Sequence, residues 1–326
     1  MGKHKVTIIK LAITAVLLTI VLRGVNFQEM AALFGSANLF WLLGGFALFL
    51  LGVVIRAFRW SVLLKGLGSR IRYGRLVELY FVAGFFNTIF PSSITGDVVR
   101  AYEAAQDVPA GIAAGTVIID RATGILALFM LALLALPFRP DTFPNLLLIQ
   151  IVVICTVGLI GGFVVLQGSL VRKFGRFVPE VARPLWNKLD TMLAAVEACG
   201  WRSIWLAIGI SFIFNLMQTG WWWAAGKALN YDISFVYYML TTPIMSLAIL
   251  LPSIGGLGIR EGLAPLLFTG AGLSYSEAVA LSLLVFAIER TSGLMGGPIY
   301  IWTILRQNRQ KPENLMNTAG QKKANP

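Results

Sequence analysis

Eight apolar runs divide this sequence of 326 residues and leave little from which a water-facing surface could be built. A helix needs roughly 20 apolar residues to cross the hydrocarbon core of a bilayer, and most of the runs are long enough. Only 13% of the residues are charged, against about a quarter in soluble chains. The sequence therefore predicts an all-α polytopic membrane protein. The runs lie near residues 6–22, 39–63, 76–90, 110–136, 145–166, 201–225, 235–251 and 277–305.

Charge and residue usage argue against several other classes of protein. The net charge is +12, but the basic residues cluster between the apolar runs, as they do in membrane proteins with cytoplasmic positive loops. The single histidine, His4, lies near the N-terminus, so a histidine metal cluster or a catalytic triad is not expected. Cys155 and Cys199 form no CxxC motif. We expect no nucleic-acid partner, no metal, no cofactor and no enzymatic activity.

Two of the runs, 76–90 and 235–251, are short, and both run into a proline. Basic residues gather at 56–75, at 167–200 and at both termini, and such segments should face the cytoplasm. Eight full crossings would place 167–200 on the other side. If the two short runs enter and return as re-entrant hairpins, every basic segment lies inside. We therefore predict six full transmembrane helices, two re-entrant hairpins and cytoplasmic termini; the alternative is eight plain crossings with one loop that breaks the charge rule.

The two proline turns belong to a longer internal similarity. The first half reads FPSSITGDVVR at residues 90–100 and then DRATG, and the second reads LPSIGGLGIRE at 251–261 and then ERTSG. The predicted topology makes the two units inverted copies, at about 41–136 and 203–305, within a membrane domain of residues 1–305. Residues 306–326 are expected to form a disordered cytoplasmic tail. The turn residues are Pro91, Ser92, Ser93, Gly96, Pro252, Ser253, Gly255, Gly256 and Gly258.

Seven charged residues are predicted to lie deep in the membrane, where they must face one another or water because lipid exposure is costly. The four arginines outnumber the three carboxylates by one, and guanidinium groups match phosphate oxygens in two-point contacts. The serines and glycines of the turns also suit an anion at a helix N-terminus. The alternatives are that the charges only clamp the repeats together and that the turns only pack tightly. The seven residues are Arg100, Asp120, Arg121, Arg260, Glu261, Glu289 and Arg290.

Several motifs together resemble the flippase-like transmembrane region of lysylphosphatidylglycerol synthases over about residues 1–305. The motifs are Arg56-x-x-Arg59-Trp60, Phe85-Phe86-Asn87, Pro91-Ser92-Ser93-x-x-Gly96-Asp97-x-x-Arg100, Asp120-Arg121, Pro252-Ser253-x-Gly255-Gly256-x-Gly258 and Glu289-Arg290. The resemblance implies translocation of lipid between leaflets, with aminoacylated phosphatidylglycerol as the cargo known for the family. The synthases also carry a soluble domain that attaches the amino acid, and the sequence here ends after the membrane region.

The leading hypothesis is therefore a flippase of the bacterial inner membrane for an anionic phospholipid or a polyprenyl-phosphate-linked lipid. Its expected partners are membrane lipids and, if the cargo is a modified lipid, a separately encoded lipid-modifying enzyme. Two alternatives stay open: an enzyme of lipid metabolism, and a membrane partner subunit without transport of its own.

Overall fold

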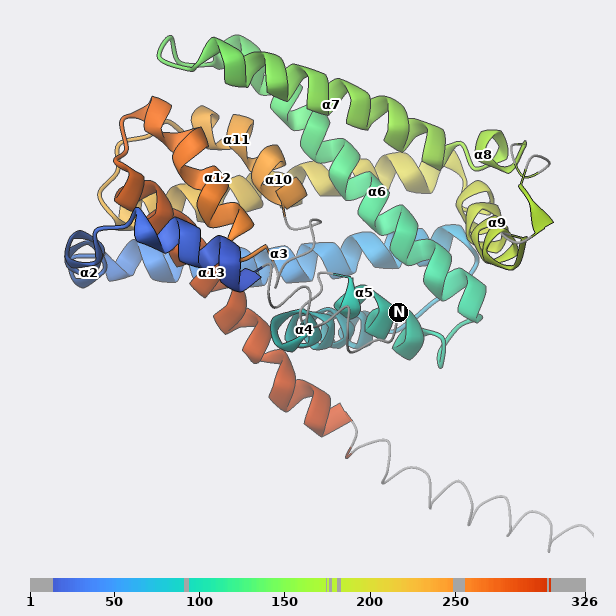
Figure 1. Ribbon diagram of the computed structural model, residues 1–326. Helices are drawn as coiled ribbons and strands as arrows, with labels where there is room; N and C mark the ends of the chain where they lie inside the picture. The colour runs from blue at the N-terminus through green and yellow to red at the C-terminus, as the bar shows by residue number, and fades with distance from the viewer. Residues whose placement is uncertain are drawn as a thin grey trace, which may run out of the picture.

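In the computed structural model, all regular secondary structure in the described residues is helical (Figure 1). These residues are 14–90, 94–173, 175, 178–180, 183–248, 256–303 and 305. After an N-terminal helix at Thr14–Arg23, the elements are α2 (Phe27–Gly35), α3 (Leu39–Gly66), α4 (Tyr73–Ile89), α5 (Thr95–Ala104), α6 (Ala110–Ala135), η1 (Leu136–Phe138), α7 (Asn145–Leu166), α8 (Ser169–Lys173), α9 (Arg183–Ala198), α10 (Trp201–Ala228), α11 (Phe235–Ala248), α12 (Ile259–Phe268), η4 (Thr269–Ala271) and α13 (Tyr275–Leu294).

Five of the helical segments are long and apolar enough to cross a membrane. A sixth candidate is the pair Thr14–Arg23 and α2, whose axes are bent by 91° at a short break. The described residues thus contain five to six candidate spans, and the six full crossings stay a prediction. The five are Leu39–Gly66, Ala110–Phe138, Asn145–Leu166, Trp201–Ala228 and Tyr275–Thr303.

Residues 23–38, which follow the first apolar run, are mostly helical because α2 occupies much of this segment. The side chain of Asn26 accepts hydrogen bonds from the backbone N–H groups of Gln28 and Glu29 at 3.1 and 3.2 Å. This N-cap satisfies donors that a helix start otherwise leaves without partners, so a short helix begins there.

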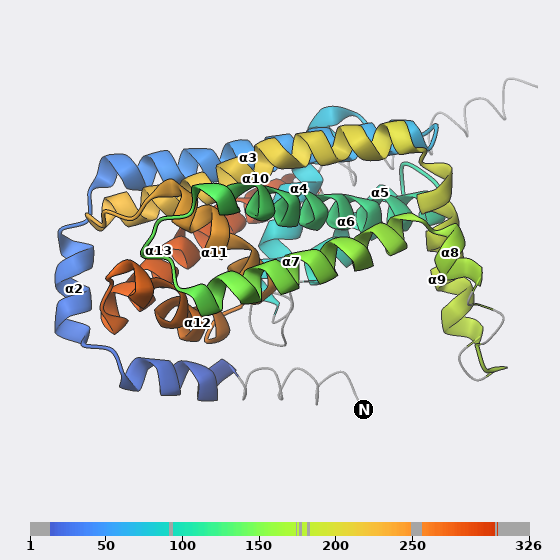
Figure 2. The ribbon, with the colours of Figure 1, turned by 90° about the horizontal axis from the view of Figure 1, so that it is seen from above.

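The two short apolar runs form helices that are shorter than the five candidate spans. The first is α4, of 17 residues, and α5 follows it after the turn; the second is α11, of 14 residues, and α12 follows it. Figures 1 and 2 show α11 and α12 toward the end of the molecule where α2 lies, and α5 toward the end where α8 and α9 lie. The predicted turn residues Pro91, Ser92, Ser93, Pro252, Ser253 and Gly255 lie outside the described residues.

Helices α3 and α10 lie side by side in opposite directions along much of their length (Figure 2). Small residues make this close approach possible, as is usual between membrane helices. A Cβ atom at Gly52 would lie 3.3 Å from the rings of Phe214 and Trp221, and one at Gly220 would lie 3.1 Å from Leu48. This helix pair forms one wall of the cavity described below.

Gly96 lies where α5 packs closely against α4, so a substitution at this residue tests that packing directly. Its N–H donates a hydrogen bond to Oδ1 of Asn87 at 2.7 Å, and an added Cβ would overlap the carbonyl oxygen of Ala83. Because that obstacle is backbone, we expect Gly96→Ala to lower the free energy of unfolding by about 1–3 kcal/mol, as other overpacked sites do. Thermal melting in detergent measures the change.

Gly44→Ala is the matched control, since Gly44 also lies inside a helix and has open space at its Cβ position. Alanine favours a helix over glycine, so this variant should melt at or slightly above the wild-type temperature. Equal melting of both variants would show that α4 and α5 are not packed this closely.

Candidate functional site

Asp120 lies on α6, within a candidate span, and only 2% of its surface is exposed. Its Oδ1 accepts a hydrogen bond from Nε of Arg59 at 2.7 Å. Its Oδ2 accepts two more, from Nη1 of Arg100 at 3.0 Å and from the hydroxyl of Tyr80 at 2.6 Å. A buried charge is tolerated when it is paired and hydrogen-bonded, as this one is. The three donors belong to α3, α5 and α4, so one carboxylate joins four helices.

Aromatic rings surround the guanidinium group of Arg100. Its central carbon lies 4.6 Å from the ring centre of Trp60 and 4.3 Å from that of Tyr80, within the range of cation–π attraction. The indole N–H of Trp60 donates to Oγ1 of Thr116 at 3.0 Å, which fixes the ring against α6. Arg100 is therefore held by both charge and stacking.

Asp97 lies in the first turn of α5, one turn before Arg100. Its Oδ1 accepts from Nη2 of Arg100 at 3.3 Å, and its Oδ2 accepts from Nε of Arg121. The side chain of Arg121 remains 36% exposed, whereas that of Arg100 is 2% exposed. Adjacent residues on a helix point about 100° apart, which is why Asp120 and Arg121 reach different partners.

The second half of the chain has a buried ion pair of the same kind. Nη1 of Arg260 on α12 lies 2.7 Å from Oε2 of Glu289 on α13, and the Arg260 guanidinium lies 5.1 Å from the ring centre of Trp222. The next residue, Glu261, accepts hydrogen bonds from the N–H of Gly258 at 2.6 Å and from the hydroxyl of Ser282 at 3.2 Å. Glu261 therefore caps the start of α12.

Arg290 joins α13, in the second half of the chain, to α4 in the first half. Its Nη1 donates to the backbone carbonyl of Asn87 on α4 at 2.7 Å. The side chain of the same asparagine accepts the bond from Gly96, so α13, α4 and α5 meet at this residue. The position of α4 and α5 thus depends on an arginine that lies about 200 residues away in the chain.

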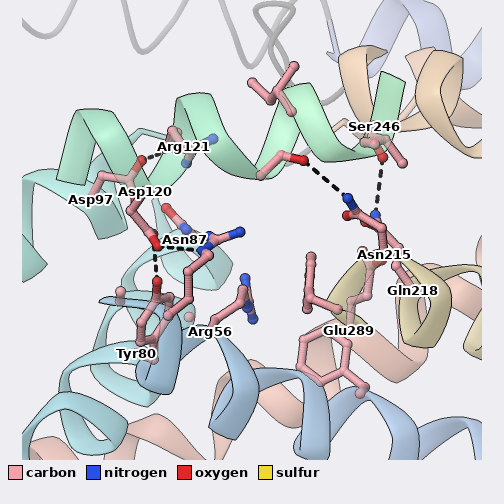
Figure 3. A pocket seen from close by; sticks show the side chains of 18 of the residues that line it. Arg56, Tyr80, Asn87, Asp97, Asp120, Arg121, Asn215, Gln218, Ser246 and Glu289 are labelled. Atoms are coloured by element: carbon pink, nitrogen blue, oxygen red, sulfur yellow. Dashed lines mark hydrogen bonds and ion pairs between the residues drawn. The ribbon is translucent and has the colours of Figure 1, made fainter. Parts of the chain in front are cut away.

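A cavity of about 300 Å³ lies among α3, α4, α5, α6, α10, α11 and α13 (Figure 3). The charged residues among its lining side chains are five arginines and three carboxylates, a surplus of two positive charges. Each carboxylate is already part of an ion pair. These charged residues are Arg56, Arg59, Arg100, Arg121, Arg290, Asp97, Asp120 and Glu289.

Arg56 differs from its neighbours because its side chain has no hydrogen bond or ion pair with any residue that the structure describes. Its guanidinium lies between two rings, 5.2 Å from the centre of Tyr80 and 5.0 Å from that of Phe214. Its Nε atom is buried without a hydrogen-bond partner in this part of the chain. Figure 3 shows the side chain at the cavity between Tyr80 and Glu289. Arg56 therefore presents a positive charge that is not paired with any carboxylate among the described residues.

Uncharged polar side chains line the side of the cavity away from Asp97 and Asp120 (Figure 3). The amide nitrogen of Asn215 donates to the backbone carbonyl of Gly124 at 3.1 Å, and that of Gln218 donates to the hydroxyl of Ser246 at 3.1 Å. Each bond engages one N–H of the side-chain amide and orients that side chain.

The structure brings together five of the seven charged residues singled out from the sequence: Arg100, Asp120, Arg121, Glu289 and Arg290 all line the cavity. Arg260 and Glu261 do not line it. They are each 1% exposed, and their contacts are the ion pair and the helix cap described above. Of the predicted turn residues, Gly96 packs on α4, and Gly258 is the N-cap of α12 with φ +85°. Gly256 has φ +89° and accepts a backbone hydrogen bond from Arg260.

Sequence reasoning assigned Arg56 and Arg59 to a basic cytoplasmic segment, whereas α3 continues to Gly66 and carries both side chains to the cavity. Their spacing of three residues, which puts both on one face of a helix, was the available signal. For Asp97, the only sequence indication of a role at the site was its place in the resemblance motif. Tyr80 lay within an apolar run and had no such indication. In the described part of the chain, His, Cys, Asp and Glu side chains form no group of three or more that could hold a metal ion.

Replacing Asp120 by asparagine tests whether this carboxylate organises the site. The change leaves Arg59 and Arg100 buried without their shared counter-charge, so we expect the free energy of unfolding to fall by about 3–5 kcal/mol. Asp232→Asn is the control: a hydrogen bond from Lys227 lowers the pKa of this exposed carboxyl, and exposed pairs contribute little. An Asp120→Asn variant that melts like the control would contradict the organising role.

The chain matches a protein family by sequence. The family described as the lysylphosphatidylglycerol synthase TM region matches residues 7–291, which include every residue that lines the cavity. No curated protein matches the chain significantly. The match covers most of the sequence and agrees with the motif resemblance, so the chain is a multi-pass membrane protein that belongs to the lysylphosphatidylglycerol synthase transmembrane-region family.

Proposed function

We propose that the chain is a flippase of the bacterial inner membrane, which moves an anionic phospholipid or a polyprenyl-phosphate-linked lipid between the two leaflets. The observation that carries the proposal is the cavity among membrane helices, whose lining has five arginines and three carboxylates. Guanidinium groups bind phosphate oxygens through two parallel hydrogen bonds, and a surplus of them favours an anion. The description of the family refers to a membrane lipid, which agrees with a lipid as the ligand.

The roles of the charged residues differ in this proposal. Arg56 and Arg121 would contact the phosphate, because Arg56 has no carboxylate partner among the described residues and Arg121 is partly exposed. Arg100, Arg59 and Asp120 would hold the aromatic wall and the hairpin in position. Arg260 and Glu289 would act as a structural clamp in the second half. A clamp is the alternative that the sequence left open for all of the charged residues.

The contacts of the two halves support an inverted repeat. In the first half, the arginine after the turn stacks on Trp60 and pairs with Asp120. In the second half, Arg260 stacks on Trp222 and pairs with Glu289. Each arginine thus uses a tryptophan from the preceding long helix and an acid from the following one. Inverted repeats whose broken helices meet near the midplane are a common construction in transporters.

The proposed topology has six crossings, two re-entrant hairpins (α4–α5 and α11–α12) and cytoplasmic termini. No nucleotide-binding motif is involved; an ion gradient or the membrane potential is the proposed energy source, and the potential supplies about 2.3 kcal/mol per charge per 100 mV.

Cysteine labelling tests the topology. Arg70→Cys and Glu180→Cys lie in exposed, basic connections, and both should react only from the cytoplasmic side in a background without Cys155 and Cys199. Asp232→Cys, in the exposed connection after α10, is the control and should react from the opposite side. A membrane-impermeant maleimide applied to intact cells and to inverted vesicles measures this. Labelling of positions 70 and 180 from opposite sides would restore eight crossings and remove the inverted repeat.

Reconstitution tests transport. In proteoliposomes with acyl-labelled fluorescent phosphatidylglycerol, Arg121→Gln should keep its fold and lower the translocation rate at least about tenfold, because it removes one charge-assisted hydrogen bond of about 1.5–3 kcal/mol. Reduction of the fluorophore from outside the vesicle measures translocation. Arg70→Gln removes the same charge from an exposed connection and should transport normally. Normal transport by folded Arg121→Gln would contradict a role for the cavity.

A further inference from the structure

We infer that the cavity selects a lipid phosphate whose attached headgroup is uncharged and rich in hydroxyl groups, and that it rejects aminoacylated headgroups. This inference rests on the proposed function and deepens it, because it names the class of lipid that the cavity binds. It departs from the cargo that the family name suggests.

The carboxylates of the cavity are all committed to arginines. Asp120 pairs with two arginines, Asp97 pairs with Arg100 and Arg121, and Glu289 pairs with Arg260. An aminoacyl headgroup such as a lysyl ester carries ammonium groups, which need a carboxylate or several oxygen acceptors once they leave water. Among the described lining residues, every carboxylate that an ammonium group would need is held by a guanidinium. The surplus of positive charge would also repel the ammonium.

Arg56 supplies the contact for the phosphate. It stands among like charges, since Arg59 lies one turn away on α3 and Arg100 shares the ring of Tyr80 with it. A guanidinium in such a place is stabilised when an anion joins it, and a phosphodiester offers two oxygens that fit its fork. The rings of Tyr80 and Phe214 restrict the guanidinium before the ligand arrives, so less side-chain entropy is lost on binding.

Asn215, Gln218 and Ser246 supply contacts for the rest of the headgroup. They lie on the side of the cavity away from Asp97 and Asp120, and all three are uncharged (Figure 3). The amide nitrogens of Asn215 and Gln218 each donate one hydrogen bond within the protein and keep one further N–H, and the two amide oxygens remain as acceptors. Neutral acceptors match the hydroxyl groups of a glycerol or sugar. An ammonium group would gain only partial compensation from them, because they carry no charge.

Competition between two lipids tests the inference. Purified protein in detergent is mixed with equal amounts of phosphatidylglycerol and lysylphosphatidylglycerol, and native mass spectrometry counts the bound molecules of each. The wild type should retain phosphatidylglycerol over its lysyl derivative by at least about tenfold, a difference of about 1.4 kcal/mol. Free sn-glycerol 3-phosphate, which has the headgroup chemistry without acyl chains, should displace the lipid poorly; equally effective displacement would assign the cavity to a soluble phosphate.

Two variants make the result specific to the cavity. Arg56→Gln should lower the binding of phosphatidylglycerol at least about tenfold, while Arg70→Gln, its control on an exposed connection, should not. Gln218→Glu adds a carboxylate of the same size and should raise the share of lysylphosphatidylglycerol at least about tenfold. Its control is Gln28→Glu on the exposed face of α2. Melting temperatures close to the wild type show that each variant is folded.

The outcomes separate the inference from the proposed function. If lysylphosphatidylglycerol binds as well as phosphatidylglycerol, and both depend on Arg56, the inference is wrong and the proposed function stands. If neither lipid depends on Arg56 in folded protein, the cavity is not a lipid site and both fail. A wild-type preference for phosphatidylglycerol, together with phosphatidylglycerol binding that Arg56→Gln weakens and a preference that Gln218→Glu removes, supports the inference.

Discussion

The carboxylate of Asp120 is the interaction on which the rest of the site depends. A charged side chain near the bilayer centre costs about 2.5–3.5 kcal/mol on insertion scales, so it persists only with partners. Arg59, Arg100 and Tyr80 supply those partners from three other helices. The helices must be placed so that this carboxylate keeps its three partners. This requirement constrains the length of α3, the position of α4 and α5, and the orientation of α6. The same requirement fixes the aromatic wall on which Arg100 stacks.

The two halves share this arrangement and yet differ in what they leave for a ligand. In the second half, one arginine and one acid form a closed pair, and Glu261 is used to cap α12. In the first half, Arg56, Arg59 and Arg121 are added to the pair of Arg100 and Asp120, and the excess of positive charge arises there. The first half therefore provides the charge of the cavity, while α10 and α11 of the second half provide its neutral polar side. A lipid headgroup has the same division into a charged and a neutral part.

Much of the fold follows from the sequence because the bilayer imposes simple rules. The long spans follow from apolar length, and the two short helices were marked by prolines that interrupt apolar runs. Five of the eight charged residues that line the cavity were found from the cost of burying charge. Arg56 and Arg59 were missed because the charge rule assigned them to a basic cytoplasmic segment, although the apolar run 39–63 contains both and α3 continues past them to Gly66. The asparagine cap of α2 was a local signal that hydropathy does not weigh. The roles of Arg260 and Glu261 depend on three-dimensional partners, so sequence position alone could not separate a clamp and a cap from a ligand contact.

The central claim is that the arginine-rich cavity holds the phosphate of a membrane lipid. Cryo-electron microscopy of the protein in nanodiscs of phosphatidylglycerol tests this most directly. The account predicts headgroup density inside the cavity, with the phosphate within about 4 Å of the Arg56 guanidinium and the glycerol toward Gln218. Lipid density confined to the outer surface of the helices, with only water-sized features beside Arg56, would contradict it.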